Sequence, residues 1–460
     1  FVTSEIGKIR TGRANTEMFN NILVSYYDND TPLNQVANIA AIDAITVSIQ
    51  PFDKTVIDDI ERAILESDLG FNPSNNGNSI MITFPPLSAE RRQELVKVAS
   101  KIIEDGRISV RNIRREIIQS EEGMSKDNWK QLAELGLLGV PFSENDGGLE
   151  FGSVETMIVA EEFGKGLVVE PYIQTVVTCG GFLRRASEAQ RQEHLPSLIS
   201  GDEIWAFAYA EPQGRFNLAD IKVSASKSGD DYTLNGDKCV VSAAPWAQKL
   251  IVSARTSGDQ SDKEGISLFI VDKASDGVST RDYKTVDGSM ASEVSFENVK
   301  LSNSSLIGEE GNAYSLIELV ADETIAALCA EAIGAMSVLN ETTVEYCKTR
   351  KQFGQPIGKF QVLQHRMVDM FMQYEQSVSM TYMVNLKLEE EDVERSKAAS
   401  GAKVQICNAA KFIGQSAVQL HGGMGMTDEL NVGHYFKRLS MIETQLGNAD
   451  HHLKKYSLAS

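Results

Sequence analysis

The sequence has few cysteines and no long apolar run. Its five cysteines stand singly and form no CxxC pair, which argues against a disulfide framework and a thiolate metal site. We therefore expect buried free thiols in a reducing compartment. No apolar run reaches about 18 residues, so no transmembrane helix is expected. The first residues lack the charged and apolar regions of a signal peptide, so the default expectation is a soluble cytoplasmic protein without a membrane partner.

Basic residues are also in deficit, but unevenly along the chain. The net charge is −20 over 460 residues. Residues 1–117 hold 13 Lys and Arg against 16 Asp and Glu, whereas the remaining residues hold 31 against 48. The second part should therefore repel nucleic acid at long range, while the nearly neutral first part could still dock locally. A chain of this length suggests about three or four domains.

The first 117 residues alternate between strand-like and helix-like patterns. β-Branched and aromatic residues predict strands at residues 22–27, 44–50 and 79–83, and apolar spacing predicts a helix at residues 58–67. A long helix is expected after Pro85-Pro86, with Ser88 as its N-cap.

Arginines punctuate the two ends of this segment. Arg107, Arg111 and Arg114 follow helical spacing and share one face, and Arg10 and Arg13 flank a Thr-Gly pair. Guanidinium groups suit the phosphate oxygens of an RNA backbone. A basic helix face is more often simply solvated, so the residues alone leave both interpretations open.

Five motifs follow one another along this segment: Arg10-Thr-Gly-Arg-Ala14, Leu33-Asn-Gln-Val-Ala-Asn38, Gln50-Pro-Phe-Asp-Lys54, Pro85-Pro-Leu87 and Arg111-Asn-Ile-Arg-Arg115. Together they resemble ribosome recycling factor, a family that pairs a three-helix bundle with an inserted β/α domain. The resemblance implies that Arg10, Arg13 and Arg114 face ribosomal RNA, that the inserted domain spans about residues 15–86, and that the ribosome is a partner. The family's third helix has no counterpart before the second segment begins, so we expect a truncated module.

The rest of the chain changes periodicity twice. Ser125 is a candidate N-cap for a helix that ends at Gly136, and helical patterns continue to about residue 200. Period-two patterns then predict a β-domain, in which Asn235-Gly236 indicates a hairpin turn. From Ala313 the pattern is helical almost to the end, so the order is helices, β-domain, helices, an α+β architecture.

Two clusters of polar residues and glycine carry the chemistry. The segment from Arg350 to Gln361 combines a guanidinium, a Gly-Pro turn and Phe353, a composition that suits a bound pyrophosphate. The segment from Gln419 to Gly425 contains Gly422 and Gly423, where the backbone can approach a ligand closely. Each cluster alone is about equally well explained by ordinary helix termination and surface packing.

Together and in this order, the two clusters resemble the acyl-CoA dehydrogenase family. The resemblance implies a helical domain at residues 118–203 that lacks the family's first helix, a β-barrel-like middle domain at 204–305 and a C-terminal helical bundle at 306–460. It implies FAD, with Phe207, Tyr209 and Ser242 at the flavin ring. It further implies that Arg350, Gln352, Phe353 and Gln361 hold the pyrophosphate region, while Gln419, Gly422 and Gly423 meet the dinucleotide of an adjacent subunit. Ala210 and Val240 replace the family's usual Thr and Trp.

The reaction of this family needs a carboxylate base to take the α-proton of an acyl-CoA thioester. The usual position of that base is Leu446 here, and the alternative position is Thr324, with Glu323 one residue earlier. Leu446 cannot accept a proton and Thr324 is a poor base. Glu323 points about 100° away on the helix, and a solvated acid at the helix start is its simpler explanation.

This pattern resembles the small, non-base-bearing subunits of two-subunit acyl-CoA dehydrogenases of fatty acid or steroid degradation, such as pimeloyl-CoA dehydrogenase. We therefore expect a base-bearing partner subunit and an electron-transferring flavoprotein as acceptor. His421, His434, His451 and His452 match no compact metal site. Two alternatives stay open: a ribosome-binding translation factor that carries the second segment as cargo, and an inactive fusion of two fragments.

Overall fold

A computed structural model of the chain describes residues 22–26, 29–41, 46–66, 73–77, 79–83, 117, 120 and 122–459. The chain divides into two compact units, residues 1–113 and 114–460. The predicted helix after Pro85-Pro86 lies outside the described residues, as do Arg10, Arg13 and Arg114.

The described part of the first unit is a small antiparallel sheet with one amphipathic helix. The strands run in the order β3-β4-β6-β5, and β1 pairs separately with β2. Ile57, Ile60 and Ile64 of α3 share one core with alternate residues of β4 and β6, so the predicted helix and the three predicted strands are confirmed. The elements are β1 (Leu23–Tyr26), β2 (Asn29–Pro32), α2 (Leu33–Val36), β3 (Ala37–Ala41), β4 (Thr46–Pro51), η2 (Lys54–Val56), α3 (Ile57–Glu66), β5 (Ser74–Asn75) and β6 (Ile80–Thr83).

The second unit begins with a helical layer. The hydroxyl of Ser125 accepts a hydrogen bond from the Asn128 amide at 3.2 Å, and Gly136 at φ +76° ends the first helix, as predicted. A seven-residue π-helix, η5, which the sequence did not predict, precedes α7. The layer comprises α5 (Lys126–Glu134), η3 (Leu137–Gly139), η4 (Glu144–Asp146), α6 (Ser153–Gly166), η5 (Ile173–Cys179), α7 (Gly180–Leu183) and α8 (Glu188–Ile199).

The β-domain is one eight-stranded sheet in the order β12-β13-β9-β8-β10-β11-β14, with β7 added beside β10. β7 runs parallel to β10, and its first residue, Trp205, pairs with Lys249. The elements are β7 (Trp205–Ala208), β8 (Ser224–Ser228), β9 (Asp231–Ser242), β10 (Lys249–Arg255), β11 (Ile266–Asp272), β12 (Val278–Lys284), β13 (Met290–Leu301), η6 (Asn303–Ser305) and β14 (Leu306–Ile307).

The predicted hairpin at Asn235-Gly236 is wrong. Both residues lie inside the twelve-residue strand β9, and the turn comes earlier, at Gly229-Asp230, where Ser228 pairs with Asp231. Gly236 adopts φ +129°, and a Cβ there would lie 2.9 Å from Val223. The glycine therefore allows the backbone near Val223 to approach strand β9 closely and does not form a turn. Local composition does not distinguish these two uses of glycine.

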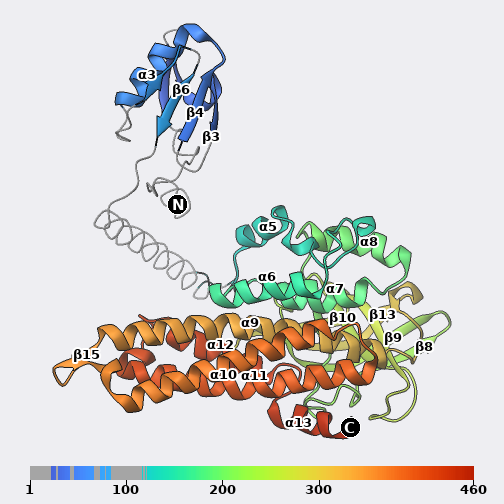
Figure 1. The fold of residues 1–460 in the computed structure, drawn as a ribbon. Helices are drawn as coiled ribbons and strands as arrows, with labels where there is room; N and C mark the ends of the chain where they lie inside the picture. The colour runs from blue at the N-terminus through green and yellow to red at the C-terminus, as the bar shows by residue number, and fades with distance from the viewer. Residues whose placement is uncertain are drawn as a thin grey trace. The chain divides into compact units, whose positions relative to one another are not determined.

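The C-terminal helices form an elongated bundle in which α9, α10 and α11 run side by side (Figure 1). The short β15–β16 hairpin lies at one end of this bundle and the β-domain at the other (Figure 1). None of the helices in the described residues combines the length and apolar character needed to cross a bilayer. The elements are α9 (Tyr314–Thr349), β15 (Lys351–Gln352), β16 (Gln355–Pro356), η7 (Ile357–Lys359), α10 (Gln361–Leu386), α11 (Asp392–His421), η8 (Gly422–Met426), α12 (Val432–Thr444) and α13 (Ala449–Leu458).

Two glycines bring the helical layer against the bundle. A Cβ on Gly164 of α6 would lie 1.9 Å from the Glu331 carbonyl oxygen, and one on Gly334 of α9 would lie 2.0 Å from the Glu161 carbonyl oxygen. The backbones of α6 and α9 therefore touch at their crossing. This contact fixes the helical layer relative to the long helix that carries the candidate site.

A buried ion pair organises the β-domain. Lys238 Nζ lies 2.8 Å from Glu211 Oε1, and both side chains are almost fully buried. Lys238 also donates to Ser253 Oγ at 3.1 Å, while Glu211 accepts from the amides of Lys222 and Val223. Desolvation lowers the pKa of Lys238 to about 8, although Glu211 opposes that shift. Both groups therefore remain charged near neutral pH.

We expect Lys238→Met to lower the free energy of unfolding by about 3–5 kcal/mol, because it leaves the Glu211 carboxylate buried without its partner. Chemical denaturation measures the loss. Lys130→Met, at an exposed position of α5, is the matched control and should change stability by less than about 0.5 kcal/mol. Adding Glu211→Gln to Lys238→Met should recover part of the loss, and a further drop in the double variant would contradict the buried-charge explanation.

Candidate functional site

The residues predicted at a flavin ring, Phe207, Tyr209 and Ser242, form the ring-side set. Phe207 of β7 stacks on Tyr209 with ring centroids 5.3 Å apart. On its other side Phe207 meets Phe182 of α7 at 4.7 Å. The structure thus brings Phe207 and Tyr209 together at the junction of the β-domain and the helical layer. Burial raises the pKa of the Tyr209 hydroxyl to about 12, so it stays protonated at neutral pH.

The turn that carries Leu446 closes over this aromatic stack. The Tyr209 hydroxyl hydrogen bonds with the backbone of Leu446, which adopts the left-handed φ of +55°. The next residue, Gly447, has φ +118°, and a Cβ there would lie 2.7 Å from His452 Nε2. His452 Nε2 donates to the Leu446 carbonyl at 3.0 Å, and His452 Nδ1 accepts from Ser400 Oγ at 3.2 Å. The hydrogen bond from His452 therefore stabilises the turn at Leu446 and Gly447.

A small cavity of about 40 Å³ lies between the helical layer, the β-domain and the bundle. Ser242, Gln445 and Tyr172 are among its lining residues. The Tyr172 hydroxyl is buried and makes no hydrogen bond with any described residue. Such an orphaned donor is rare in proteins, and a polar ligand atom in this cavity would satisfy it.

A buried cluster of charges forms one wall of the same cavity. Arg438 of α12 makes a bidentate pair with Glu331 of α9, at 2.5 and 2.7 Å, and also donates to Asp287 Oδ2 at 2.9 Å. Although burial opposes it, the two carboxylates raise the pKa of Arg438. This cluster links the bundle to the β-domain beside Ser242.

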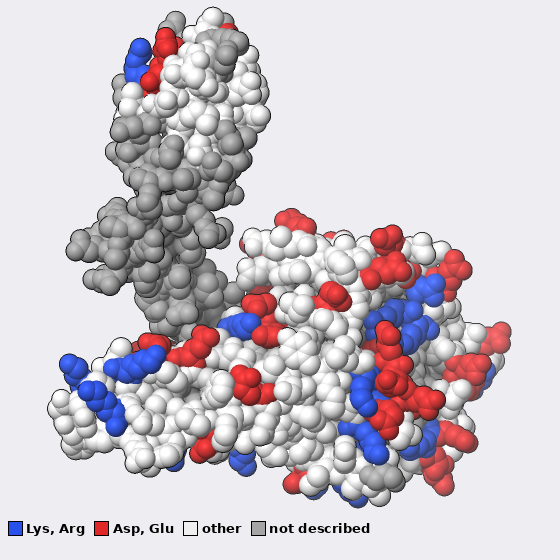
Figure 2. Space-filling model, in the orientation of Figure 1, with Lys and Arg blue, Asp and Glu red and all other residues white. Residues whose placement is uncertain are grey.

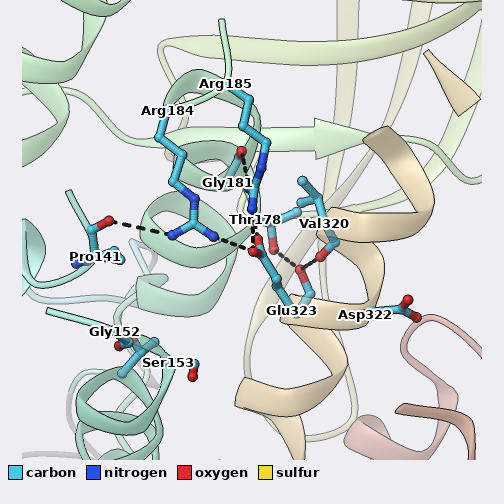
Figure 3. Close-up of polar contacts among 12 residues, drawn as sticks. Pro141, Gly152, Ser153, Thr178, Gly181, Arg184, Arg185, Val320, Asp322 and Glu323 are labelled. Atoms are coloured by element: carbon cyan, nitrogen blue, oxygen red, sulfur yellow. Dashed lines mark hydrogen bonds and ion pairs between the residues drawn. The ribbon is translucent and has the colours of Figure 1, made fainter. Parts of the chain in front are cut away.

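The three positions considered for a catalytic base hold no available carboxylate. Leu446 is aliphatic, and Thr324 Oγ1 donates to the Val320 carbonyl at 2.8 Å and lies 3.0 Å from Thr178 Oγ1. Glu323 is bound by both Arg184 and Arg185, whose guanidinium groups converge on it (Figure 3). The Glu323 carboxylate is therefore committed to an ion-pair cluster that ties α7 to α9.

The phosphate-side set comprises the residues predicted to hold the dinucleotide: Arg350, Gln352, Phe353, Gln361, Gln419, Gly422 and Gly423. Its first members surround the β15–β16 hairpin. Phe353, at φ +52°, is 91% exposed, and its ring meets that of Phe360 edge-on at 6.1 Å. The exposed Arg350 guanidinium makes no hydrogen bond or ion pair with the described residues. A free guanidinium beside an exposed aromatic ring can bind an anion and cover it.

The glycine turn lies beside this hairpin. The ring of His421, at the end of α11, stacks on Tyr346 of α9 at 4.3 Å, and the Tyr346 hydroxyl donates to the His421 carbonyl at 3.4 Å. Gly422 has φ +60°, and a Cβ on either Gly422 or Gly423 would meet no atom within 4 Å. The turn therefore presents open backbone, and the structure brings its two glycines together with the Arg350 loop.

The β15–β16 hairpin of the phosphate-side set lies at the end of the bundle away from the β-domain (Figure 1), whereas the ring-side set lies at the junction of the β-domain and the helical layer. Thr324 contacts Thr178 of η5, and Thr175 of η5 donates to the Trp205 carbonyl on the strand of Phe207. Arg350 follows Thr324 by 26 positions, a rise of about 39 Å along α9. It follows Glu331, which lines the same cavity as Ser242, by 19 positions, a rise of about 29 Å. The structure therefore does not bring the Arg350 loop to the ring-side set of the same chain.

Several residues of the site escaped the sequence reasoning. Local sequence patterns assigned no role to Arg184, Arg185 or Tyr172. Glu331 did carry a signal, because it is a lone carboxylate inside the apolar run Ala330-Glu331-Ala332. Within the described residues no group of three His, Cys, Asp or Glu side chains is placed to hold a metal ion.

Family models match both parts of the chain. The acyl-CoA dehydrogenase N-terminal, middle and C-terminal domains match residues 90–202, 206–299 and 321–455. Ribosome recycling factor matches residues 2–134. The two family matches overlap at residues 90–134.

Individual relatives match the same two parts of the chain as the family models. The mitochondrial 2-methylacyl-CoA dehydrogenase of Solanum tuberosum is 31% identical over 328 residues, which are 70% of this chain and 79% of that protein. The ribosome-recycling factor of Desulfatibacillum aliphaticivorans is 49% identical over 120 residues, which are 26% of this chain and 65% of that protein. The chain thus spans just under two thirds of this second relative.

Solved structures share the fold of the second unit. Butyryl-CoA dehydrogenase from Megasphaera elsdenii superposes with a TM-score of 0.68 at 26% identity, covering 73% of this chain and 90% of its own. An FAD complex of PigA gives 0.70 at 26% identity, covering 75% and 92%. A variant of the Tcur3481-Tcur3483 steroid ACAD gives 0.69 at 27% identity, covering 76% and 92%.

His452 should make the stability of the second unit depend on pH. Burial, aided by Lys403 and His451, lowers the pKa of His452 to about 3. The unfolded chain takes up a proton near pH 6.5 that the folded chain refuses, so this contribution is complete above pH 6.5 and declines as the pH falls towards 3. We expect the loss from this group to reach about 2 kcal/mol at pH 5.

Denaturant unfolding at pH 7 and pH 5 measures this effect. His452→Gln should reduce the difference in stability between the two pH values by about 2 kcal/mol. The matched control, His365→Gln at an exposed position of α10, should leave that difference unchanged. An unchanged pH dependence in His452→Gln would show that this ring is not buried in its neutral form.

Proposed function

The chain belongs to the acyl-CoA dehydrogenase family over its last three quarters, and from that premise we propose that it is an FAD-binding dehydrogenase subunit whose catalytic base comes from a partner chain. The reaction is the α,β-dehydrogenation of an acyl-CoA thioester. The single observation that carries the base-supplying partner is the lack of an available carboxylate at positions 446, 324 and 323, and the separation of the two sets along α9 supports a cofactor site shared between chains.

The residues present fit the cofactor. When bound, FAD supplies the acceptor for the hydride that leaves the β-carbon of the acyl group. The orphaned Tyr172 hydroxyl beside Ser242 offers a donor at the ring end. At the other end, the free guanidinium of Arg350 and the open backbone of Gly422 and Gly423 suit a pyrophosphate.

A single chain cannot offer both ends to one dinucleotide, because about 29 Å of helix separates Glu331, beside Ser242, from Arg350, and about 39 Å separates Thr324 from Arg350. We infer that the ring-side set of one subunit and the phosphate-side set of an adjacent subunit complete each FAD site. The bundle has a surface for such a neighbour. The face of the bundle in Figure 2 carries few charged side chains compared with the β-domain, and α10 exposes the apolar residues Val362, Val368, Phe371, Met372, Tyr382 and Leu386.

The absence of an available carboxylate at positions 446, 324 and 323 supports a division of labour between subunits. The partner chain would take the α-proton of the thioester, while this chain would bind FAD and complete the interface. The similar steroid ACAD carries two component names, Tcur3481 and Tcur3483, which provides a precedent for such a pair. The electron acceptor that we propose is an electron-transferring flavoprotein, and acyl-chain specificity would depend on the assembled pair.

We expect the full chain folded with excess FAD to retain flavin absorbance near 450 nm after gel filtration, and Arg350→Ala to weaken FAD binding at least about tenfold, since a hydrogen bond to a charged group contributes about 1.5–3 kcal/mol. Lys351→Ala, one residue along the same exposed hairpin, is the matched control and should bind FAD normally. Butyryl-CoA should not bleach the flavin of this chain alone, because none of positions 446, 324 and 323 offers an available carboxylate.

Two results would contradict the proposal. Colourless protein after folding in FAD would remove the cofactor assignment. Rapid bleaching by butyryl-CoA without a partner would remove the division of labour, and Glu323→Gln would then be the first variant to examine.

A second candidate function is ribosome binding through residues 1–117, and the 49% identity to a ribosome-recycling factor over 120 residues favours it. Arg10, Arg13 and Arg114 remain the proposed RNA contacts. The chain should pellet with ribosomes through a sucrose cushion, and Arg114→Ala should reduce the bound fraction several-fold, whereas the control Arg62→Ala on the exposed side of α3 should not. A chain that stays wholly in the supernatant would contradict ribosome binding, and the dehydrogenase function would be the one that remains.

A further inference from the structure

A second, larger cavity lies away from the ring-side and phosphate-side sets. Its volume is about 390 Å³, and it opens between the start of α6, the η5–α7 helix, α9 and the α10–α11 turn. None of its lining residues belongs to either set. Its apolar wall is formed by Val176, Val177, Leu319, Ala327 and Leu388. Small-molecule sites have volumes of about 300–1,000 Å³, so the cavity is large enough for a small ligand.

On the charged side of this cavity, two guanidinium groups pair with one carboxylate. Arg185 Nη2 lies 2.6 Å from Glu323 Oε1, its Nη1 lies 3.2 Å from Glu323 Oε2, and Arg184 binds the same carboxylate (Figure 3). Two cations therefore share one anion. The Arg184 and Arg185 side chains are only 29% and 31% exposed, and their Nε–H groups donate to no described residue.

The second positive charge is partly desolvated, which costs free energy. Burial lowers the pKa of Arg184, and the neighbouring Arg185 lowers it further, although Glu323 opposes both. A partly desolvated cation without a counter-ion costs free energy that a bound anion would recover. The N-terminus of the 14-residue helix α6, at Gly152 and Ser153, also borders the cavity and adds partial positive charge.

The other charges of the cavity do not cancel this excess. Arg395 is already paired with Asp322 at 3.1 Å and with Asp392 at 2.8 Å, and Asp322 points away from the Glu323 cluster (Figure 3). Glu389 and Glu390 are exposed on the α10–α11 turn, where solvent screens them. The three arginines and three glutamates that line the cavity balance formally, but Glu389 and Glu390 are exposed, so the charge left without a partner at the apolar wall is one of the two guanidinium groups on Glu323.

We propose that this cavity binds a small amphiphilic monoanion, a carboxylate with a short unbranched apolar chain. The carboxylate lies on the Nε–H edges of Arg184 and Arg185, and the chain lies along Val176, Val177 and Leu319. One excess positive charge matches a monocarboxylate better than a dianionic phosphate. The apolar wall accounts for the chain, because burying it contributes free energy that a bare anion does not gain.

Isothermal titration calorimetry of the full chain with four probes tests the proposal: hexanoate, hexan-1-ol, hexylamine and inorganic phosphate. Hexanoate should bind at least about tenfold more tightly than hexan-1-ol, which has the chain without the charge. It should also bind more tightly than phosphate, which has the charge without the chain. Absence of hexanoate binding, equal binding of hexan-1-ol, or preferential binding of hexylamine would overturn the proposal.

Two variants should shift hexanoate binding in opposite directions. Arg185→Met removes half of the anion site and should weaken binding about tenfold. Glu323→Gln removes the competing carboxylate but keeps the side-chain shape, so it should strengthen binding several-fold. Damage to the fold would weaken binding in both variants, so this opposite pair separates ligand recognition from structure.

Arg281→Met, at an exposed position of β12, removes one positive charge far from the cavity and should leave binding unchanged. Weaker binding by Glu323→Gln would overturn the proposal. FAD binding is measured separately by flavin absorbance, so failure of the proposed dehydrogenase function and failure of this site are distinguishable. If Arg185→Met does not fold, Glu323→Gln and the four-probe series still decide the outcome.

Discussion

The length of α9 is the constraint on which the rest of the second unit depends. This helix has 36 residues and therefore a rise of about 54 Å. Near its start it contacts η5 and, through η5, the β7 strand that carries Phe207. At its other end it delivers Arg350 to the exposed hairpin beside the glycine turn of α11. The contact of α6 with α9 at Gly164 and Gly334 fixes the position of the helical layer along α9. Under the proposed function, cofactor binding is therefore a property of an assembly, because α9 keeps the two sets apart within one chain.

The carboxylates near the junction of the β-domain and the bundle are used for structure. Glu211 is paired with Lys238, Glu331 with Arg438, and Glu323 with two arginines. A base must reach the α-proton of the substrate, whereas the side chains of these three carboxylates are held in place by their lysine or arginine partners. The same pairing that removes Glu323 from catalysis leaves a surplus guanidinium beside the second cavity. One ion-pair cluster thus links the missing base to the proposed monoanion site.

Sequence reasoning predicted what depends on local patterns. The Ser125 cap, the α3 helix and the helix–sheet–helix order follow from spacing and capping rules that act over a few residues. The prediction of a hairpin at Asn235-Gly236 was wrong because the glycine is required by close contact with Val223, thirteen positions away, and not by a local turn. Glu323 and its arginines are more than 130 residues apart, so their pairing depends on tertiary structure that no local pattern encodes. The separation of Arg350 from Phe207 likewise became visible only when α9 proved to be continuous.

Sedimentation velocity monitored at 450 nm tests the central claim most directly, because it records only the species that carry flavin. The account predicts that flavin absorbance sediments with dimers or larger assemblies, of this chain alone or with a partner chain, and disappears as dilution releases single chains. Flavin that stays bound to single chains after dilution would contradict the claim that two subunits complete each FAD site.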